Sequence, residues 1–243
     1  EMAGAVPAEA GSVIYFSDDA NLRNMMQKRC MEETRLGIPM IFGHDVIHGY
    51  RTIAPVPLAQ AASWNPDLVR TISRDAAKEA YYGGLDWTFS PMVDIARDPR
   101  WGRVMEGYGE DPYLTSVFCK AAVEGYQGND LSAEGSIAAC LKHFVGYGAS
   151  EAGRDYVYTE ISDQALWDTY LPSFHAGVES GAATVMSAFN NISGIPASAN
   201  KYTMTDILKK KWNWDGMIVS DWDAVIQLTN QGAAKDGYEA AAL

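Results

Sequence analysis

The chain has 243 residues, of which 47% are hydrophobic and 21% are charged, a composition typical of a globular domain with a sizeable core. Its net charge of −12 at pH 7 repels phosphate backbones and argues against a nucleic-acid partner. No apolar run approaches the roughly 20 residues of a membrane-spanning helix, and the three widely spaced cysteines predict neither a disulfide framework nor a zinc site.

Short β-rich runs alternate with helical stretches along the whole chain. The expected strands lie at residues 11–16, 38–45, 86–95, 138–147, 184–190 and 216–222. Several of these runs are almost continuously apolar, as strands covered on both faces are. The repeated alternation of strand and helix predicts a parallel sheet with crossover helices.

Three of the expected helices have readable boundaries or faces. Asn65 and Asp111 each precede a proline at a first helical position, which predicts a capped helix start. Pro172 lies within the helical run 162–180 and should kink or divide it. One buried stripe is expected on the first of these helices, at Leu68, Ile72, Ala76 and Ala80.

Six strands fit either an open doubly wound sheet or most of an eight-stranded barrel. A G-x-G-x-x-G turn after the first strand would favour a dinucleotide-binding sheet, and the sequence has none. We therefore expect an α/β fold of the (β/α)8 TIM-barrel type, with about six β/α units present and the barrel incomplete. The chain stops in a helix-forming run, so we expect residues 1–243 to be part of a longer protein.

Chemically active side chains follow most of the expected strands. In a β/α barrel these carboxyl ends converge on one face, where active sites lie. The residues are Asp45, Asp94, the arginines of RDPRWGR (97–103), Lys142, His143, residues 186–190, Asp221 and Trp222. Carboxylates and cations suit a polyhydroxylated ligand, a tryptophan offers a flat face to a sugar ring, and nearby cations keep an aspartate ionised.

Several of these segments resemble a known family. The segments are GHDVIHG (43–49), RDPRWGR (97–103), EGYGEDP (106–112), LKHFVGYG (141–148) and IVSDW (218–222). Together, and in this order, they resemble the catalytic barrel of family 3 glycoside hydrolases, especially bacterial β-glucosidases of the periplasmic type. The resemblance extends from about residue 30 to the end of the chain.

The resemblance implies a retaining, exo-acting β-glucosidase that forms a covalent glycosyl-enzyme. Carried onto this chain, the nucleophile is Asp221, and Asp223 is a helix cap or a solvated acid. The residues expected to hold the terminal sugar are Asp45, Arg51, Arg103, Lys142, His143, Met186 and Trp222. The expected substrate is a β-glucoside or short β-linked oligosaccharide, without cofactor or metal, and the expected location is periplasmic or secreted.

Two departures from the family pattern bear on function. Phe189 stands where many relatives have a tyrosine near the nucleophile, which should alter how Asp221 is oriented. In two-domain relatives the acid/base glutamate comes from a downstream α/β sandwich domain, and no residue of this chain can be assigned to it. A β-xylosidase of the same family, or a sugar-binding fragment lacking its acid/base, therefore stays open as an alternative.

Two other readings find less support in the sequence. The β-N-acetylglucosaminidase branch of the family typically reads KHFPGHG, whereas Val145 and Tyr147 replace the proline and histidine here. His44 and His48 have a metal-ligand spacing for a helix, but Gly49 follows them and the glutamate of a zinc hydrolase is absent. Neither a hexosaminidase nor a metal site is expected.

Overall fold

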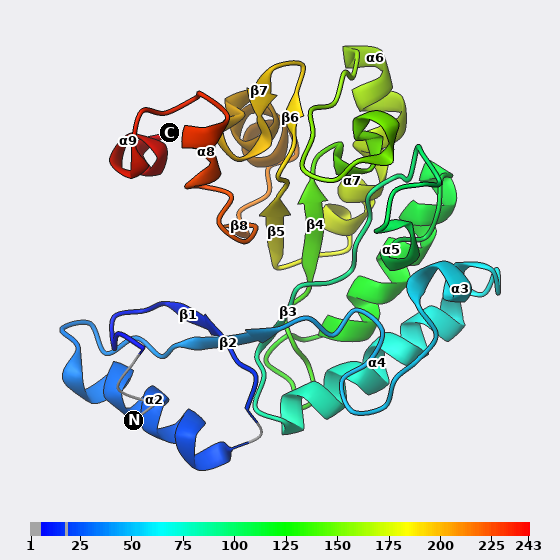
Figure 1. The fold of residues 1–243 in the computed structure, drawn as a ribbon. Helices are drawn as coiled ribbons and strands as arrows, with labels where there is room; N and C mark the ends of the chain where they lie inside the picture. Colours follow the sequence, from blue (N-terminus) through cyan, green and yellow to red (C-terminus); the bar gives the residue numbers. More distant parts are fainter. Residues whose placement is uncertain (1–5, 18) are drawn as a thin grey trace.

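The computed structural model describes residues 6–17 and 19–243 and has an α/β fold with parallel sheets (Figure 1). The strands of these sheets are β1 (Ser12–Ile14), β2 (Ile41–His44), β3 (Trp87–Thr88), β4 (Cys140–Phe144), β5 (Thr184–Ser187) and β8 (Met217–Ser220). Each of them lies within one of the six expected strand ranges. Sequence periodicity therefore located every strand of the parallel sheets.

The strands form two parallel sheets, ordered β1-β2-β3 and β4-β5-β8. Two parallel bridges, Trp87 to Ala138 and Met92 to Lys142, connect the sheets into one series. The expected run 86–95 is a regular strand only at Trp87–Thr88, because Pro91 lacks the N–H that a ladder requires. Among the described residues, β1 and β8 each pair with one strand and are the two edges of the series.

Helices lie between successive parallel strands along the chain and also follow the last of them, β8 (Figure 1). Their bounds are α2 (Ala20–Glu33), α3 (Pro57–Ala61), α4 (Pro66–Tyr82), α5 (Pro112–Gln127), α6 (Asp163–Ala165), α7 (Pro172–Glu179), α8 (Gln227–Asn230) and α9 (Gly237–Ala242). A π-helical segment, Tyr202–Lys211, crosses from β5 to β8. None of the helices in the described part of the chain is both long and apolar enough to cross a membrane.

The expected helix boundaries are confirmed. The side chains of Asn65 and Asp111 accept hydrogen bonds from the backbone N–H groups of Leu68 and Leu114 and cap α4 and α5. The run around Pro172 is divided into α6, a π-helical turn and α7, with α7 starting at the proline. Capping residues and prolines act on the adjacent backbone, so the helix boundaries that they predict are kept in the folded chain.

The buried face of α4 differs from the expected stripe. Leu68 is 42% exposed, and the buried residues are Val69, Ser73, Ala76, Ala77 and Ala80. The reason is the close approach of α5, where a β-carbon at Gly125 would lie 2.6 Å from the Ser73 β-carbon. The expectation is confirmed at Ala76 and Ala80 and is wrong at Leu68 and Ile72, which are not buried. The buried face is rotated toward Ser73, because small residues that admit a neighbouring helix do not stand out in a hydrophobic pattern.

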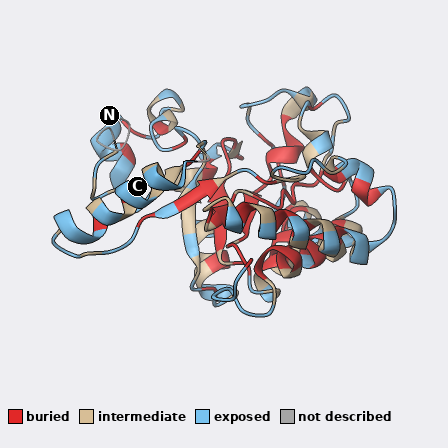
Figure 2. Cartoon of the chain, turned by 90° about the horizontal axis from the view of Figure 1, so that it is seen from below, coloured by how far each residue is buried: buried red, intermediate tan, exposed pale blue. Residues whose placement is uncertain are grey.

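The core fills the space between the strands and the helices α4, α5 and α7. Figure 2 shows the buried positions gathered on the strands and on the helix faces toward them, with exposed positions outside. A short antiparallel hairpin, β6 (Asn191–Ile192) and β7 (Ile195–Pro196), was not expected from the sequence. This core fixes the strand ends at which the expected polar residues converge.

Candidate active site

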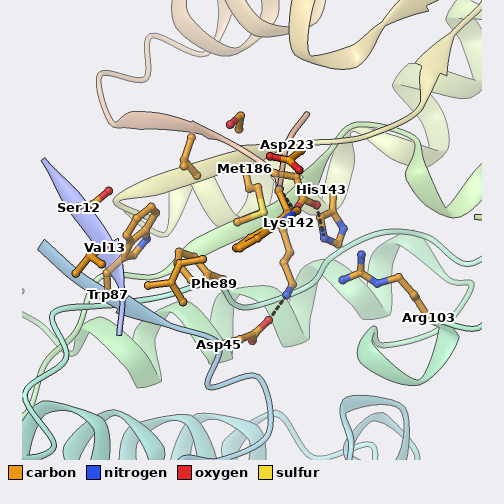
Figure 3. A pocket seen from close by; sticks show the side chains of 15 residues that line it. Ser12, Val13, Asp45, Trp87, Phe89, Arg103, Lys142, His143, Met186 and Asp223 are labelled. Atoms are coloured by element: carbon orange, nitrogen blue, oxygen red, sulfur yellow. Dashed lines mark hydrogen bonds and ion pairs between the residues drawn. The ribbon is translucent and has the colours of Figure 1, made fainter. Parts of the chain in front are cut away.

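A cavity of about 410 Å³ lies at the carboxyl ends of the strands. Its lining comes from β1, from the residue that follows β2, from β3 and the segment after it, from β4 and β5, and from β8 and the residues after it (Figure 3). The lining residues are Ser12, Val13, Ile14, Asp45, Trp87, Phe89, Arg103, Lys142, His143, Met186, Val219, Ser220, Asp221, Trp222 and Asp223. Many of the strand-end residues singled out in the sequence thus line one cavity, namely Asp45, Arg103, Lys142, His143, Met186, Asp221 and Trp222.

Seven of the eight expected site residues line this cavity, and Arg51 does not. The backbone N–H of Arg51 donates to Glu79 Oε2 on α4 at 3.0 Å, and the next residue, Thr52, binds the same carboxylate. This anchoring holds the loop after Asp45 against α4, on a different surface from the cavity lining. We leave Arg51 out of the proposed site.

The segment β4 brings two neighbouring residues into the same cavity. In a regular strand, successive side chains point to opposite faces. The pairing of β4 with β5 shifts register between Leu141 and Phe144, so that three steps along β4 match two along β5. An extra residue of this kind is a β-bulge, which redirects side chains beside active sites. Lys142 and His143 can therefore both face the cavity.

A buried cation and a carboxylate meet at the floor of the cavity. Lys142 Nζ donates to Asp45 Oδ2 at 2.6 Å and lies 4.0 Å from Glu106 Oε2. The side chain of Lys142 is 3% exposed and that of Asp45 is 43% exposed. Asp45 therefore keeps an open side through which a ligand hydroxyl can reach the pair, which Figure 3 shows at the base of the cavity.

Arg103 forms a second charged pair at the edge of the cavity. Its guanidinium donates to both oxygens of Glu106, at 2.7 and 2.8 Å, and lies 5.6 Å from the ring centre of Tyr147. Burial works against both charges, yet the pairing raises the pKa of Arg103 and lowers that of Glu106. Both groups stay ionised and fixed. Arg100, from the same RDPRWGR segment, pairs instead with Asp98.

Asp221 follows the end of β8 and is oriented through one of its two oxygens. Oδ1 accepts a hydrogen bond from the backbone N–H of Trp222 at 2.6 Å. Oδ2 is buried and has no hydrogen-bond partner among the described residues, with His143 Nε2 at 3.4 Å. Burial raises the pKa of this carboxyl above its ordinary value, although Arg103 and Lys142 oppose the shift. Asp221 therefore has one anchored oxygen and one free oxygen.

The other expected residues border this centre. Met186 is buried on β5, and Trp222 is 68% exposed beside the cavity. Phe189 packs against the rings of Tyr147 and Tyr156, with centroids 5.8 and 4.6 Å away. Asp223 caps no helix through its side chain, since α8 begins four residues later, and it is an exposed acid at the cavity rim.

Two carboxylates of the site network had no expected function. Asp94 binds His143, and Glu106 binds Arg103. The sequence places Asp94 at a strand end, but it gives no signal for the histidine that Asp94 meets or the arginine that Glu106 meets. Within the described residues, no group of three or more His, Cys, Asp or Glu side chains is placed to hold a metal ion.

The model of the glycosyl hydrolase family 3 N-terminal domain matches residues 4–242 of the chain. The chain belongs to glycosyl hydrolase family 3. A periplasmic β-glucosidase of Salmonella typhimurium is 42% identical over 232 residues, which cover 96% of this chain and 30% of the relative. A β-xylosidase of Formosa agariphila is 36% identical, over 93% of this chain and 33% of the relative.

Solved structures of the family superpose closely on this fold. A β-glucosidase from Listeria innocua in complex with glucose matches with a TM-score of 0.92 and 45% identity, over 96% of this chain and 33% of that chain. A variant of the same enzyme in complex with laminaribiose matches with a TM-score of 0.91. This family 3 chain therefore spans about a third of the length of these relatives.

Proposed function

We propose that this chain is the nucleophile-bearing part of a retaining, exo-acting β-glucosidase. The observation that carries the proposal is the geometry of Asp221 in the cavity lining. Its Oδ1 is anchored by the backbone N–H of Trp222, and its buried Oδ2 has no hydrogen-bond partner among the described residues. A carboxylate nucleophile needs an oriented oxygen without a competing hydrogen bond. The names of the relatives, β-glucosidase and β-xylosidase, support a β-glycoside as the substrate.

In the proposed reaction, Asp221 Oδ2 attacks the anomeric carbon of the terminal sugar. The new C–O bond replaces the glycosidic C–O bond, and the leaving-group oxygen takes a proton from an acid that this chain does not supply. Water then attacks the glycosyl ester, loses a proton to the conjugate base of that acid, and releases the sugar and the Asp221 carboxylate. Two displacements at the same carbon return the β-anomer.

The cavity residues hold the sugar in this proposal. Asp45 and Lys142 bind adjacent hydroxyls as a charged acceptor and donor, which are stronger than neutral hydrogen-bonding groups. Arg103 and His143 contact hydroxyls nearer to Asp221, and Met186 and Trp222 form apolar walls. The sugar ring flattens as it approaches the transition state. Contacts that become stronger during this change lower the activation barrier of the reaction, and not only the dissociation constant of the substrate.

We further propose that the six parallel strands are six of an eight-stranded barrel, with the closing strands and the acid/base supplied from outside this chain. The support is the placement of β1 and β8 on the same cavity, although each is an edge of the strand series. A periplasmic or secreted location is proposed from the name of the Salmonella relative.

The proposed reaction predicts that hydrolysis of a β-glucoside releases β-glucose first. The test is proton NMR of the first product anomer, with 2,4-dinitrophenyl β-glucoside as substrate because its leaving group needs little acid assistance. The chain and any longer form of the protein are measured in parallel. An α-anomer as first product would contradict the mechanism. Faster cleavage of the matched β-xyloside would favour the xylosidase alternative, and sugar binding without cleavage would favour a binding protein.

The raised pKa of Asp221 predicts a specific acid limb in the pH profile. The attacking form is the carboxylate, so the rate of glycosyl-enzyme formation falls as pH drops through the pKa of this group. Since burial raises that pKa above 3.8, the acid limb is expected at a higher pH than for an ordinary aspartate. Pre-steady-state release of dinitrophenol as a function of pH measures it. A rate that stays constant down to pH 3.8 would contradict the assignment.

A further inference from the structure

Asp94 is a buried carboxylate that the proposed reaction does not use. It is 2% exposed and follows β3, on the loop that leads to Arg103. Its Oδ2 accepts a hydrogen bond from the backbone N–H of His143 at 2.9 Å and lies 2.8 Å from Nδ1 of the same residue. Its Oδ1 has no partner among the described residues. All the contacts of this carboxylate are therefore directed at one histidine.

The backbone contact determines which imidazole nitrogen bears the proton. A backbone N–H can only donate, so Asp94 Oδ2 is an acceptor. Burial raises the pKa of Asp94 to about 7, so the group is a carboxylate above that pH. The same oxygen faces Nδ1, and with Asp94 ionised that contact is a hydrogen bond only if Nδ1 carries the hydrogen. Burial, together with Arg103 and Lys142, lowers the pKa of His143 well below its ordinary value. The imidazole is therefore neutral, with a hydrogen on Nδ1 and a lone pair on Nε2.

This tautomer matters because Nε2 lies 3.4 Å from Asp221 Oδ2. A hydrogen on Nε2 would be donated to that oxygen and would occupy a lone pair needed for attack. Without it, Oδ2 stays free while Oδ1 is anchored by Trp222. An unprotonated Nε2 also offers an acceptor to a hydroxyl in the cavity, whereas Lys142 and Arg103 are pure donors.

We propose that Asp94 is a positioning residue that keeps the His143 proton on Nδ1, so that Asp221 Oδ2 is free to attack and Nε2 accepts a hydrogen bond from a sugar hydroxyl. The role of the freed oxygen rests on the function proposed above. Asp94 does not itself line the cavity; its hydrogen bonds go to His143, which does, so it acts through that residue.

The direct test is imidazole nitrogen NMR of ¹⁵N-histidine-labelled protein at a pH well above 7, where Asp94 is a carboxylate. The experiment distinguishes a protonated from an unprotonated ring nitrogen. A His143→Gln variant assigns the signal among the four histidines. The expected spectrum has a protonated Nδ1 and an unprotonated Nε2. A proton on Nε2 would overturn the proposal, and this result requires no variant of Asp94.

Two variants of Asp94 separate positioning from structural support. Asp94→Asn keeps an oxygen acceptor and should preserve the tautomer and the rate at which Asp221 is trapped by an activated 2-deoxy-2-fluoro-β-glucoside. Asp94→Leu removes the acceptor, so the proton should move from Nδ1 to Nε2 of His143, which then donates to Asp221 Oδ2. The rate at which Asp221 is trapped should fall by about 10–100-fold, the scale seen when other orienting partners are lost. A folded Asp94→Leu variant with an unchanged spectrum and trapping rate would overturn the proposal.

Asp86→Leu is the matched control. Asp86 also accepts a hydrogen bond from the backbone N–H of a neighbouring strand, Phe42, at 3.0 Å, but it lies at the opposite end of β3 and pairs with Arg23. This variant should lose stability while keeping the His143 tautomer and the trapping rate. If NMR shows the proton on Nδ1 of His143 but the fluoroglucoside forms no adduct on Asp221, the proposed function and the role of the freed oxygen are overturned. An adduct together with a proton on Nε2 would overturn the positioning role alone.

Discussion

Replacement of Asp221 by alanine is expected to reduce the turnover of an aryl β-glucoside by about 10⁴-fold or more, the scale seen when a covalent nucleophile is lost. The variant removes the protein oxygen that, in the proposed mechanism, forms the covalent bond to the anomeric carbon. Little structural cost is expected, because Oδ2 makes no hydrogen bond among the described residues and Oδ1 makes one, to Trp222. Initial rates with 2,4-dinitrophenyl β-glucoside measure the effect.

Azide provides a second readout for the same variant. A small anion can enter the space left by the Asp221 side chain and attack the anomeric carbon in its place, which yields an α-glucosyl azide. Asp215→Ala is the matched control, since this exposed aspartate precedes the opposite end of β8 and should leave turnover unchanged. Turnover of the Asp221→Ala variant close to that of the unmodified protein would remove Asp221 from the chemistry.

Replacement of Asp45 by alanine is expected to lower kcat/KM by about 10²–10³-fold, the scale for losing a charged contact to the transition state. Two effects add. The sugar loses a charged acceptor, and Lys142, whose side chain is 3% exposed, loses its partner at 2.6 Å. A buried cation left without its partner is costly, so the lysine is expected to move and release its own hydroxyl contact.

Asp45→Asn separates these two effects because it keeps an oxygen acceptor without the charge, and its kcat/KM should lie between those of the alanine variant and the unmodified protein. Asp206→Ala is the control for a lost aspartate–lysine pair, since Asp206 binds Lys210 at 2.8 Å on the exposed face of the π-helical segment. Equal kcat/KM for Asp45→Ala and the unmodified protein would exclude Asp45 from the sugar site.

Much of the fold could be predicted because its signals are local. The strands are apolar over several consecutive residues, and the starts of α4 and α5 carry a capping side chain directly before a proline. The burial of Leu68 could not be predicted from the local sequence. Its spacing is correct for a buried helical stripe, but the direction in which α4 faces depends on how closely α5 approaches at Gly125. That approach is a tertiary property.

The site could be predicted as a set of strand-end residues but not as a network. Strand ends converge in any parallel barrel, which is why Asp45, Lys142 and Asp221 were found. The Asp94–His143 contact joins residues 49 positions apart and depends on the β-bulge in β4, for which neither residue type gives a signal. Arg51 also follows a strand end, but it does not line the cavity, and its backbone N–H binds Glu79 on α4.

The most direct test of the account is to trap the glycosyl-enzyme. An activated 2-deoxy-2-fluoro-β-glucoside forms the ester but hydrolyses slowly, and its leaving group needs little acid assistance. Peptide mass spectrometry after incubation, on this chain and on any longer form of the protein, locates the adduct. The proposed mechanism predicts a fluoroglucosyl group on Asp221. An adduct on a different residue, or none in any form of the protein that binds glucose, would contradict it.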